Sequence, residues 1–365
     1  MKGTSARVVV GLSGGVDSSV AALLLARAGA DVSGLFMKNW EEDDENGHCA
    51  AAADLADAAA VARQLEIPLH TVNFATEYWE RVFEHFLAEH AAGRTPNPDV
   101  LCNSEIKFRA FLEHARGLGA HRIATGHYAR TRTTGAGIAL LKGRDPEKDQ
   151  SYFLHRLDQR QLAAVDFPLG ELAKAEVRAL AHEAGLVTGD KKDSTGICFI
   201  GERPFGEFLA RFLPASPGDI RDPGGTVLGR HRGLMFHTLG QRRGLGIGGR
   251  AGAGEAPWYV VDKRPADNVL TVAQDPHHPL LMSTTVEVEA PHWIGPPPAL
   301  PVECACKIRY RQPDQAVRLT AAAAGRMRVE FATPQRAATP GQYAVFYEDD
   351  VCLGGGVIDT LLRPH

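Results

Sequence analysis

Short apolar runs alternate with helical periodicity over roughly the first 200 residues of the chain. The apolar run at residues 8–10 predicts a buried strand, and the spacing of Val20, Leu23 and Leu24 gives the next segment the apolar stripe of a helix. The alternation continues with strands predicted at 32–37, 69–74 and 122–125 and helices predicted around 55–65, 79–87 and 108–115. Because strands that alternate with helices form parallel sheets covered on both faces, we expect an α/β domain. Its chemistry should lie where the strands end, just after Val10, Met37 and Thr125.

The pattern changes near residue 206, where glycine and proline begin to punctuate short strand-like runs. Such punctuation is typical of all-β structure. The predicted strands cover 258–262, 269–273, 285–288, 302–308, 327–331 and 343–347. We therefore divide the chain into a domain at 1–206, a small central domain at 207–276 and a terminal barrel at 277–365.

Net charge does not exclude a polyanionic partner. The 365 residues carry a formal net charge of −4, but the acidic run at 41–45 supplies all of this excess, so basic faces are possible elsewhere. The longest unbroken apolar run, residues 20–26, is far shorter than the roughly 20 residues needed to span a bilayer. We expect no membrane segment and a cytoplasmic location, in which thiols stay reduced.

A glycine-rich turn with hydroxyl side chains separates the first predicted strand from the first helix. Glycine allows backbone amides to approach phosphate, and the helix N-terminus adds partial positive charge, so the turn suits an anion. The alternative is a tight turn with Ser18 or Ser19 as a helix N-cap. The loop lacks the Gly-Lys-Ser/Thr of a Walker loop, which gives no reason to expect γ-phosphoryl transfer. The candidate nucleotide-binding residues are Gly11, Leu12, Ser13, Gly14, Gly15, Val16, Asp17 and Ser18.

Two cysteines lie in loop-like segments and are candidates for chemistry. Cys102 ends the string Thr-Pro-Asn-Pro-Asp-Val-Leu-Cys, and Cys198 follows Asp-Ser-Thr-Gly-Ile. Nearby positive charge raises the reactivity of a thiol, and Lys191 and Lys192 are candidates to supply it beside Cys198. Two thiols that approach each other permit sulfur relay through a persulfide and a disulfide. For the other four cysteines, 49, 304, 306 and 352, we expect simple packing.

Several ordered strings of the chain resemble one family. They lie at 11–18, 95–103, 126–129, 148–154, 193–203, 237–242 and 353–356. Together they are similar to those of the bacterial tRNA-specific 2-thiouridylases, which belong to the PP-loop ATP pyrophosphatase superfamily. The resemblance implies an adenine nucleotide alpha-hydrolase-like parallel sheet, a small central domain and a C-terminal β-barrel.

The resemblance also implies a reaction. ATP, accompanied by magnesium, would adenylate the C2 oxygen of the wobble uridine in tRNAs for Lys, Glu and Gln. Cys198 would carry a persulfide delivered by a sulfur-relay protein or a cysteine desulfurase, and Cys102 would close a disulfide with it. Asp99 is the candidate general acid/base, with an Asx-turn acceptor as an equal alternative.

Binding residues follow from the same resemblance. Met37 and Gly126 correspond to adenine and ribose contacts, and the chain would bind one tRNA as a monomer. Alternation along a strand at 307–311 would also place Lys307, Arg309 and Arg311 on one face, suited either to phosphates or simply to solvent. The tRNA contacts that the resemblance assigns are Asn97, Pro98, Asp99, Lys148, Asp149, Gln150, Arg309 and Tyr310.

Two other functions use the same loop. One is an ATP-dependent amidating or ligating enzyme of the PP-loop superfamily, which would have no use for two loop cysteines or a C-terminal barrel. The other is a non-catalytic RNA-binding protein that uses ATP only as a switch.

Overall fold

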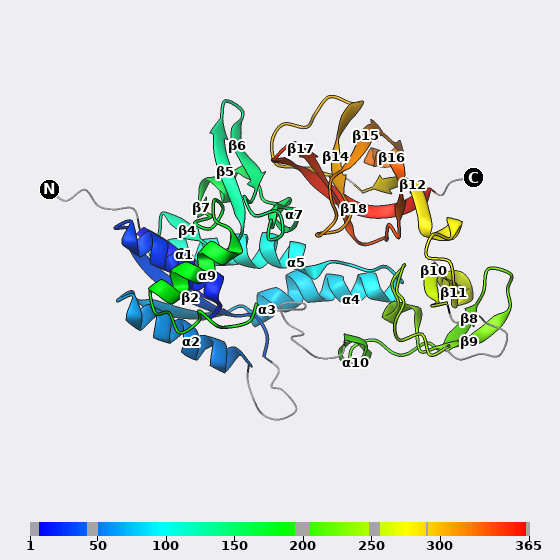
Figure 1. Cartoon of the computed structure of the whole chain (residues 1–365), viewed down its shortest axis with the longest axis horizontal. Helices are drawn as coiled ribbons and strands as arrows, with labels where there is room; N and C mark the ends of the chain where they lie inside the picture. Colours follow the sequence, from blue (N-terminus) through cyan, green and yellow to red (C-terminus); the bar gives the residue numbers. More distant parts are fainter. Residues whose placement is uncertain (1–6, 42–49, 194–204, 248–255, 290, 363–365) are drawn as a thin grey trace.

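The computed structural model describes residues 7–41, 50–193, 205–247, 256–289 and 291–362. Three sheets organise this part of the chain, and Figure 1 shows the first of them at one end of the molecule and the β8–β11 sheet and the barrel strands at the opposite end. The helices that the structure describes are all too short or too polar to cross a membrane.

The first sheet is parallel, as the alternation of strands and helices predicts. Val9 and Val10 have no exposed surface, which fits a strand covered on both faces. The strand order is β3-β2-β1-β4-β7, with β1 in the middle. The strands are β1 (Arg7–Gly11), β2 (Asp31–Lys38), β3 (Leu69–Asn73), β4 (Arg122–Ala124) and β7 (Val165–Asp166).

Helices cover both faces of this sheet. On one face α1 packs against α9, and apolar residues such as Val20 and Val177 form their shared core. The other face carries a larger core that includes Phe83, Phe108 and Phe111. The α-helices are α1 (Val16–Arg27), α2 (Ala50–Gln64), α3 (Ala75–Tyr78), α4 (Glu84–Ala91), α5 (Pro98–Leu101), α6 (Phe111–Gly117), α7 (Ser151–Leu154), α8 (Gln159–Ala163), α9 (Lys174–Glu183) and α10 (Phe205–Ala210).

Two helical rods contain π-helical turns. The turn η1 (Trp79–Phe83) joins α3 to α4, and η2 (Cys102–Ala110) joins α5 to α6. The helices predicted around 79–87 and 108–115 are therefore confirmed, although their periodicity gave no sign of the wider turn. π-Helical turns are rare and frequently occur at functional sites. One of them starts at Cys102.

The second sheet forms a small central unit with its own apolar core, which includes Ile220, Val260 and Leu270. Its strand order is β10-β11-β8-β9. The strands are β8 (Gly218–Arg221), β9 (Val227–His231), β10 (Tyr259–Arg264) and β11 (Val269–Ala273), and short 3-10 turns lie at η3 (Leu234–Phe236), η4 (Pro265–Asp267) and η5 (Pro279–Leu281).

The third sheet closes into the predicted barrel. Strands β12-β16-β15-β14-β17-β18 follow one another, and β12 also pairs with β18. The strands are β12 (Met282–Val288), β14 (Val302–Lys307), β15 (Gln315–Ala321), β16 (Met327–Arg336), β17 (Tyr343–Glu348) and β18 (Val351–Leu362), with β13 (His292–Trp293) beside β18 and the turn η6 (Ala323–Gly325) between β15 and β16.

A hairpin from the first part of the chain extends this barrel sheet. Strand β5 (Ala129–Thr134) pairs with β6 (Gly137–Lys142), and β6 pairs with β18 through Leu140 and Leu141. The sequence analysis did not predict this hairpin or its pairing with a strand some 200 residues away. The barrel and the α/β part are therefore joined by one continuous sheet.

The predicted strand alternation at 307–311 is wrong. Strand β14 ends at Lys307, and a turn follows in which the Gln312 side chain accepts a hydrogen bond from the Ile308 amide at 2.9 Å. The Gln312 amide in turn donates to the Arg309 carbonyl at 3.1 Å. These local hydrogen bonds replace the ladder, so the basic residues do not share one strand face.

Candidate active site

The glycine-rich loop lies between β1 and α1, as predicted. Gly14 has a φ of +76°, and a Cβ there would lie 2.3 Å from the Asp54 carbonyl oxygen of α2. Glycine is thus required both by the backbone conformation and by the close approach of a neighbouring helix. Leu12 anchors the start of the loop, because its amide donates to the Leu35 carbonyl at 2.9 Å.

The N-cap of α1 is Gly15, so the alternative in which Ser18 or Ser19 caps this helix is wrong. Both serines lie inside the first turns, where their hydroxyls donate to the Gly15 carbonyl at 3.0 and 2.8 Å. No side chain caps the first amides of α1. Since the first four amides of a helix lack intrahelical partners, this end of α1 suits a phosphate.

The structure brings Met37 and Gly126 to this loop from the two strands that flank β1. A Cβ on Gly11 would lie 3.4 Å from the Met37 Cε. A Cβ on Gly126 would lie 2.7 Å from the backbone of Asp17 and of Ser18. The ends of β1, β2 and β4 therefore converge, as expected for a ligand site in an open parallel sheet.

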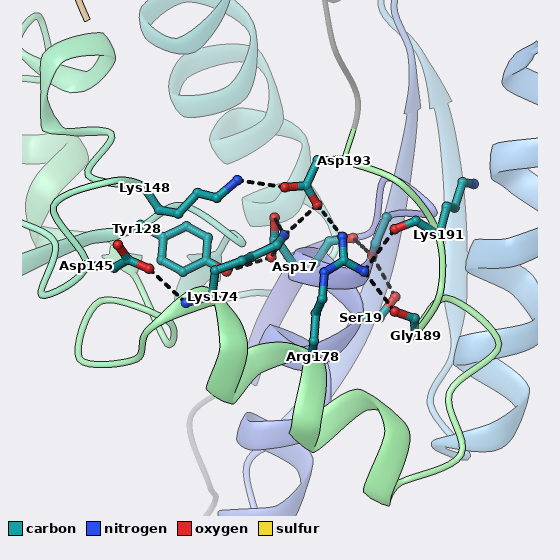
Figure 2. A network of polar contacts seen from close by, with 12 residues as sticks. Asp17, Ser19, Tyr128, Asp145, Lys148, Lys174, Arg178, Gly189, Lys191 and Asp193 are labelled. Carbon is teal, nitrogen blue, oxygen red and sulfur yellow. Dashed lines mark hydrogen bonds and ion pairs between the residues drawn. The ribbon is translucent and has the colours of Figure 1, made fainter. Parts of the chain in front are cut away.

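Asp17, in the first turn of α1, is held by two side chains from elsewhere in the chain (Figure 2). The Tyr128 hydroxyl donates to Asp17 Oδ1 at 2.8 Å. Lys174, the first residue of α9, donates through its Nζ to both carboxylate oxygens, at 2.7 and 2.9 Å. Burial, followed by the charge of Asp17, raises the pKa of Tyr128, so this hydroxyl stays protonated and donates.

Asp193 is the second anionic centre of this cluster. Its carboxylate accepts from Lys148 at 2.7 Å, from Lys174 at 2.8 Å and from Arg178 at 2.8 Å. Burial alone would raise the pKa of Asp193, but the hydrogen bonds from Lys148 and Lys174 outweigh it and lower the pKa to about 2. Lys174 is thus shared between Asp17 at the glycine-rich loop and Asp193, five residues before Cys198 in the sequence.

The positive charge of Lys191 is compensated by neighbouring carboxylates. Its ammonium pairs with Asp54 at 2.7 Å and with Asp57, both on α2. Burial alone would lower the pKa of Lys191, but these two carboxylates raise it instead. The charge of Lys191 is therefore compensated by α2, and the expectation that it activates the Cys198 thiol stays a prediction, because Cys198 lies outside the described residues.

Cys102 lies in the interior at the start of η2, with 1% of its surface exposed. Asp99 lies half-buried one turn earlier in α5. The N-cap of α5 is Asn97, whose side-chain oxygen accepts from the Asp99 amide at 3.2 Å, and Pro98 occupies the first helical position. The capping oxygen is thus Asn97 rather than Asp99, which leaves the Asp99 carboxylate outside that cap.

Cys198 lies outside the described residues, and so does Cys49. The three cysteines of the barrel are packing residues, as expected. Burial raises the pKa of Cys304 to about 12 and raises the pKa of Cys306 and Cys352 as well, which disfavours their thiolates.

The residues that the resemblance assigns to tRNA lie in several places. Lys148 and Tyr310 are brought together, because the Tyr310 hydroxyl lies 3.4 Å from the Lys148 carbonyl and its ring packs 4.5 Å from that of Phe153. Arg309 lies in the same turn, and its guanidinium donates to the Ala337 carbonyl at 2.7 Å.

Asp149 and Gln150 make internal contacts. Asp149 is 5% exposed, and its carboxylate accepts from the amides of Gly143 and Ser151 at 3.0 and 3.1 Å. The Gln150 side-chain oxygen accepts from the Tyr128 amide at 3.0 Å. Both residues therefore shape the loop that presents Lys148.

Comparison with known proteins identifies the family. A family model described as "tRNA methyl transferase HUP domain" matches residues 6–202, and two others match 206–274 ("tRNA methyl transferase PRC-barrel domain") and 283–358 ("Aminomethyltransferase beta-barrel domain"). The tRNA-specific 2-thiouridylase MnmA of Methylococcus capsulatus is 62% identical over 96% of this chain and 96% of its own length. That of Marinobacter nauticus is 59% identical over 98% of this chain and 92% of its own length.

The chain belongs to the tRNA-specific 2-thiouridylase family. The full-length relatives determine this assignment, although the descriptions of two domain models mention methyl transfer. A solved 4-thiouridine synthetase–RNA complex with bound ATP covers 57% of this chain and 50% of its own at 19% identity, and its TM-score of 0.35 is too low to support an argument.

Within this thiouridylase fold, the contact of Lys174 with Asp17 was not predicted from the sequence. Lys174 stands in no recognisable motif, and only the packing of α9 on α1 carries its ammonium to the glycine-rich loop. Tyr128 and Asp193 did lie in strings that resemble the family, but without an assigned role. A search for charged residues within those strings could have found Asp193 and its partner Lys148, but not Lys174 or Arg178.

Proposed function

We propose that this chain is an ATP-dependent tRNA-uridine 2-sulfurtransferase that replaces the C2 oxygen of the wobble uridine in tRNA with sulfur, releasing AMP and pyrophosphate. The observation that carries the proposal is the identity of 59 to 62% with full-length tRNA-specific 2-thiouridylases. The convergence of the glycine-rich loop, Met37 and Gly126 at one sheet edge supports its nucleotide step.

In the nucleotide step, ATP binds at the N-terminus of α1. The residues from Gly11 to Ser18 surround its phosphates, and Met37 and Gly126 contact adenine and ribose. A magnesium ion would accompany ATP, and Asp17 is a carboxylate that could hold it beside the phosphates. Lys174 stabilises the negative charge of the departing pyrophosphate.

In the sulfur step, adenylation first turns the uridine C2 oxygen into part of a leaving group. The terminal sulfur of a Cys198 persulfide attacks C2, and AMP leaves with the oxygen. The Cys102 thiolate then attacks the Cys198 sulfur, which forms a disulfide and leaves the other sulfur on C2; a dithiol reductant resets the pair. Asp99, three residues before Cys102, exchanges the protons that these steps require.

Substrate and partners follow from the same proposal. The tRNA contacts are Asn97, Pro98 and Asp99 with the Lys148 loop and the turn at Arg309 and Tyr310. The chain acts as a cytoplasmic monomer on tRNAs for Lys, Glu and Gln, and receives sulfur from a relay protein or cysteine desulfurase. Residues 1–206 carry catalysis, 207–276 form the central domain, and the barrel at 277–365 contacts tRNA.

Replacement of one thiol separates this function from its two alternatives. We expect Cys198→Ser to abolish the formation of 2-thiouridine from ATP, a sulfur donor and tRNA, while tRNA affinity stays within about two-fold of the original, because a single buried or loop thiol contributes little to phosphate contacts. The measurement is the absorbance of thiouridine after nuclease digestion. Cys304→Ser is the matched control, since Cys304 belongs to the barrel sheet.

The alternatives give different outcomes. Consumption of ATP with no need for tRNA would favour an amidating or ligating enzyme. Equal thiouridine yield from Cys198→Ser and from the parent chain would contradict the sulfur step.

A further inference from the structure

The turn that joins α4 to α5 contacts both the barrel and the central unit. Gly93, with a φ of +76°, ends α4, and the Arg94 amide returns to the Glu89 carbonyl at 2.9 Å. This αL glycine directs the chain away from the helix axis. The next two residues, Arg94 and Thr95, contact both other sheets.

Arg94 binds the barrel through its guanidinium. Its Nη1 donates to Asp359 of β18 at 2.7 Å, and its Nε donates to Glu89 of α4 at 2.8 Å. Arg94 and Asp359 are 19% and 16% exposed, so this pair is screened less than a surface ion pair. Arg326 also binds Asp359, at 2.9 Å, which fixes the carboxylate from the barrel side.

Thr95 uses all of its polar atoms in contacts with segments that connect the strands of the barrel and of the central unit. Its amide donates to the Pro340 carbonyl at 2.9 Å, and its carbonyl accepts from the Gln342 side chain at 2.8 Å. Its hydroxyl lies 3.3 Å from that of Thr238, which belongs to the central unit. One residue thus connects the α/β part to the barrel and to the central unit.

The approach of the barrel to Thr95 is close. Gly341 has a φ of +92°, and a Cβ there would lie 2.9 Å from the Thr95 nitrogen and 3.0 Å from its carbonyl carbon. The Gly341 amide itself donates to the Ile358 carbonyl at 2.9 Å, so this segment cannot retreat without breaking a bond to β18. Any side chain at position 341 therefore displaces Thr95.

A displacement of Thr95 reaches Cys102 through a short and stiff connection. Pro96 and Pro98 each fix φ near −65°, and Asn97 between them caps α5. Helix α5 then runs directly into η2, which begins with Cys102. Few free torsions remain between Thr95 and the thiol.

We propose that Thr95 is a positioning residue through which the barrel and the central unit set the placement of Asp99 and Cys102. Gly341 and Gln342 act through Thr95 and touch no reacting group. This inference rests on the proposed function, and it goes further because it links the parts that hold tRNA to the parts that react. When the barrel binds tRNA, its contacts with Thr95 thereby align the Cys102 thiol with the target uridine.

The test compares two glycines with nearly the same backbone strain. Gly341→Ala places a methyl group against Thr95, whereas Gly225→Ala, at a φ of +91°, adds a methyl group in open space on the central unit. We expect kcat for 2-thiouridine formation to fall about 10- to 100-fold in Gly341→Ala, since small misplacements of reacting groups cost this much. KM for ATP should stay within about two-fold, because the glycine-rich loop loses no contact.

Amide hydrogen exchange reports placement without any activity. In Gly341→Ala bound to tRNA, we expect the amides at 99–103 to exchange faster than in the parent chain, and in Gly225→Ala we expect no change. If Gly341→Ala fails to fold, Gln342→Met removes only the bond to the Thr95 carbonyl and should lower kcat by roughly 3- to 10-fold, in line with the loss of one hydrogen bond.

Three results would overturn the inference. They are equal kcat in Gly341→Ala and Gly225→Ala, a higher KM for tRNA at unchanged kcat, and unchanged exchange at 99–103. Absence of 2-thiouridine from the parent chain would instead contradict the proposed function, and the exchange measurement would still test the link.

Discussion

Two partly buried lysines of this molecule have opposite surroundings. Lys174, beside the glycine-rich loop, lies between the carboxylates of Asp17 and Asp193. Lys263, on β10 of the central unit, pairs with no carboxylate in the described part of the chain and donates only to the His237 carbonyl, at 2.7 Å. Both ammonium groups are shielded from water, but only the first is compensated.

Lys263 and the two histidines near it, His231 and His237, all have lowered pKa values. Burial lowers the pKa of Lys263 to about 8. Burial, followed by the charges of His231 and Lys263, lowers the pKa of His237 to about 4. His231 is buried beside His237, with ring centres 5.9 Å apart, and burial lowers its pKa too.

The difference shows what each cluster suits. A cation shared by two carboxylates has its charge compensated on both sides, and an incoming phosphate can replace one of these partners. A cation held only by a carbonyl is costly, and its neighbours stay neutral at pH 7. The surroundings of Lys174 therefore suit a binding site. The surroundings of Lys263 suit a structural contact whose stability decreases when its histidines are protonated.

The largest expected effect concerns Lys174. Lys174→Met leaves Asp17 and Asp193 with less compensation and removes a cation from the phosphates. We therefore expect tRNA-dependent release of pyrophosphate to fall about 100-fold. Stopped-flow or coupled assays of pyrophosphate measure this, and Lys192→Met, an exposed neighbour of the same charge, is the control. Unchanged pyrophosphate release would show that Lys174 does not act on the phosphates and is structural, as Lys263 is.

A smaller effect is expected from acid. His90 and His237 have pKa values lowered to about 4 in the folded chain, whereas the unfolded chain titrates near 6.5, so unfolding takes up protons between these values. The free energy of unfolding should fall by roughly 1–3 kcal/mol per histidine as pH drops from 7 to 4.

Calorimetry across this pH range measures the loss, and His237→Gln should flatten the slope. Asp193 loses its contribution to stability in a different pH range from the histidines. Because its pKa is lowered to about 2, that contribution is lost only as pH falls from about 4 to about 2. A stability that does not change between pH 7 and 4 would show that the histidines are not buried as described.

The smallest effect is expected for Lys263. Its pKa is lowered relative to the unfolded chain, so at pH 7 the fold bears the full cost of the buried charge. Lys263→Met removes that cost but leaves the His237 carbonyl without its donor, and we expect a net stabilisation of less than about 1 kcal/mol. Thermal melting at pH 7 measures it, and a marked loss of stability would mean that the lysine is compensated after all.

The parts of the fold that could be predicted are those in which local sequence decides the outcome. The unbroken valines before Gly11 predicted a parallel strand, and the glycines that follow predicted a loop for an anion. The end of β14 at Lys307 was not predictable in this way, because a side chain five residues later, Gln312, takes over the hydrogen bond of the ladder.

The candidate site was predictable only where its residues lie in motifs. Cys102, Asp17 and Gly126 stand in strings that signal chemistry by themselves. Lys174 becomes significant only when α9 packs on α1, and Thr95 only when a barrel loop some 245 residues later reaches it. Contacts of this kind depend on tertiary packing, which a local pattern does not encode.

The hairpin of β5 and β6 limits how this chain can be divided. Because β6 continues the barrel sheet through β18, a fragment that stops before the barrel would carry an open strand edge with unpaired amides and carbonyls. Such an edge invites aggregation, so excised catalytic fragments are poor candidates for separate study. An exchange of the barrel between relatives would have to carry this hairpin with it.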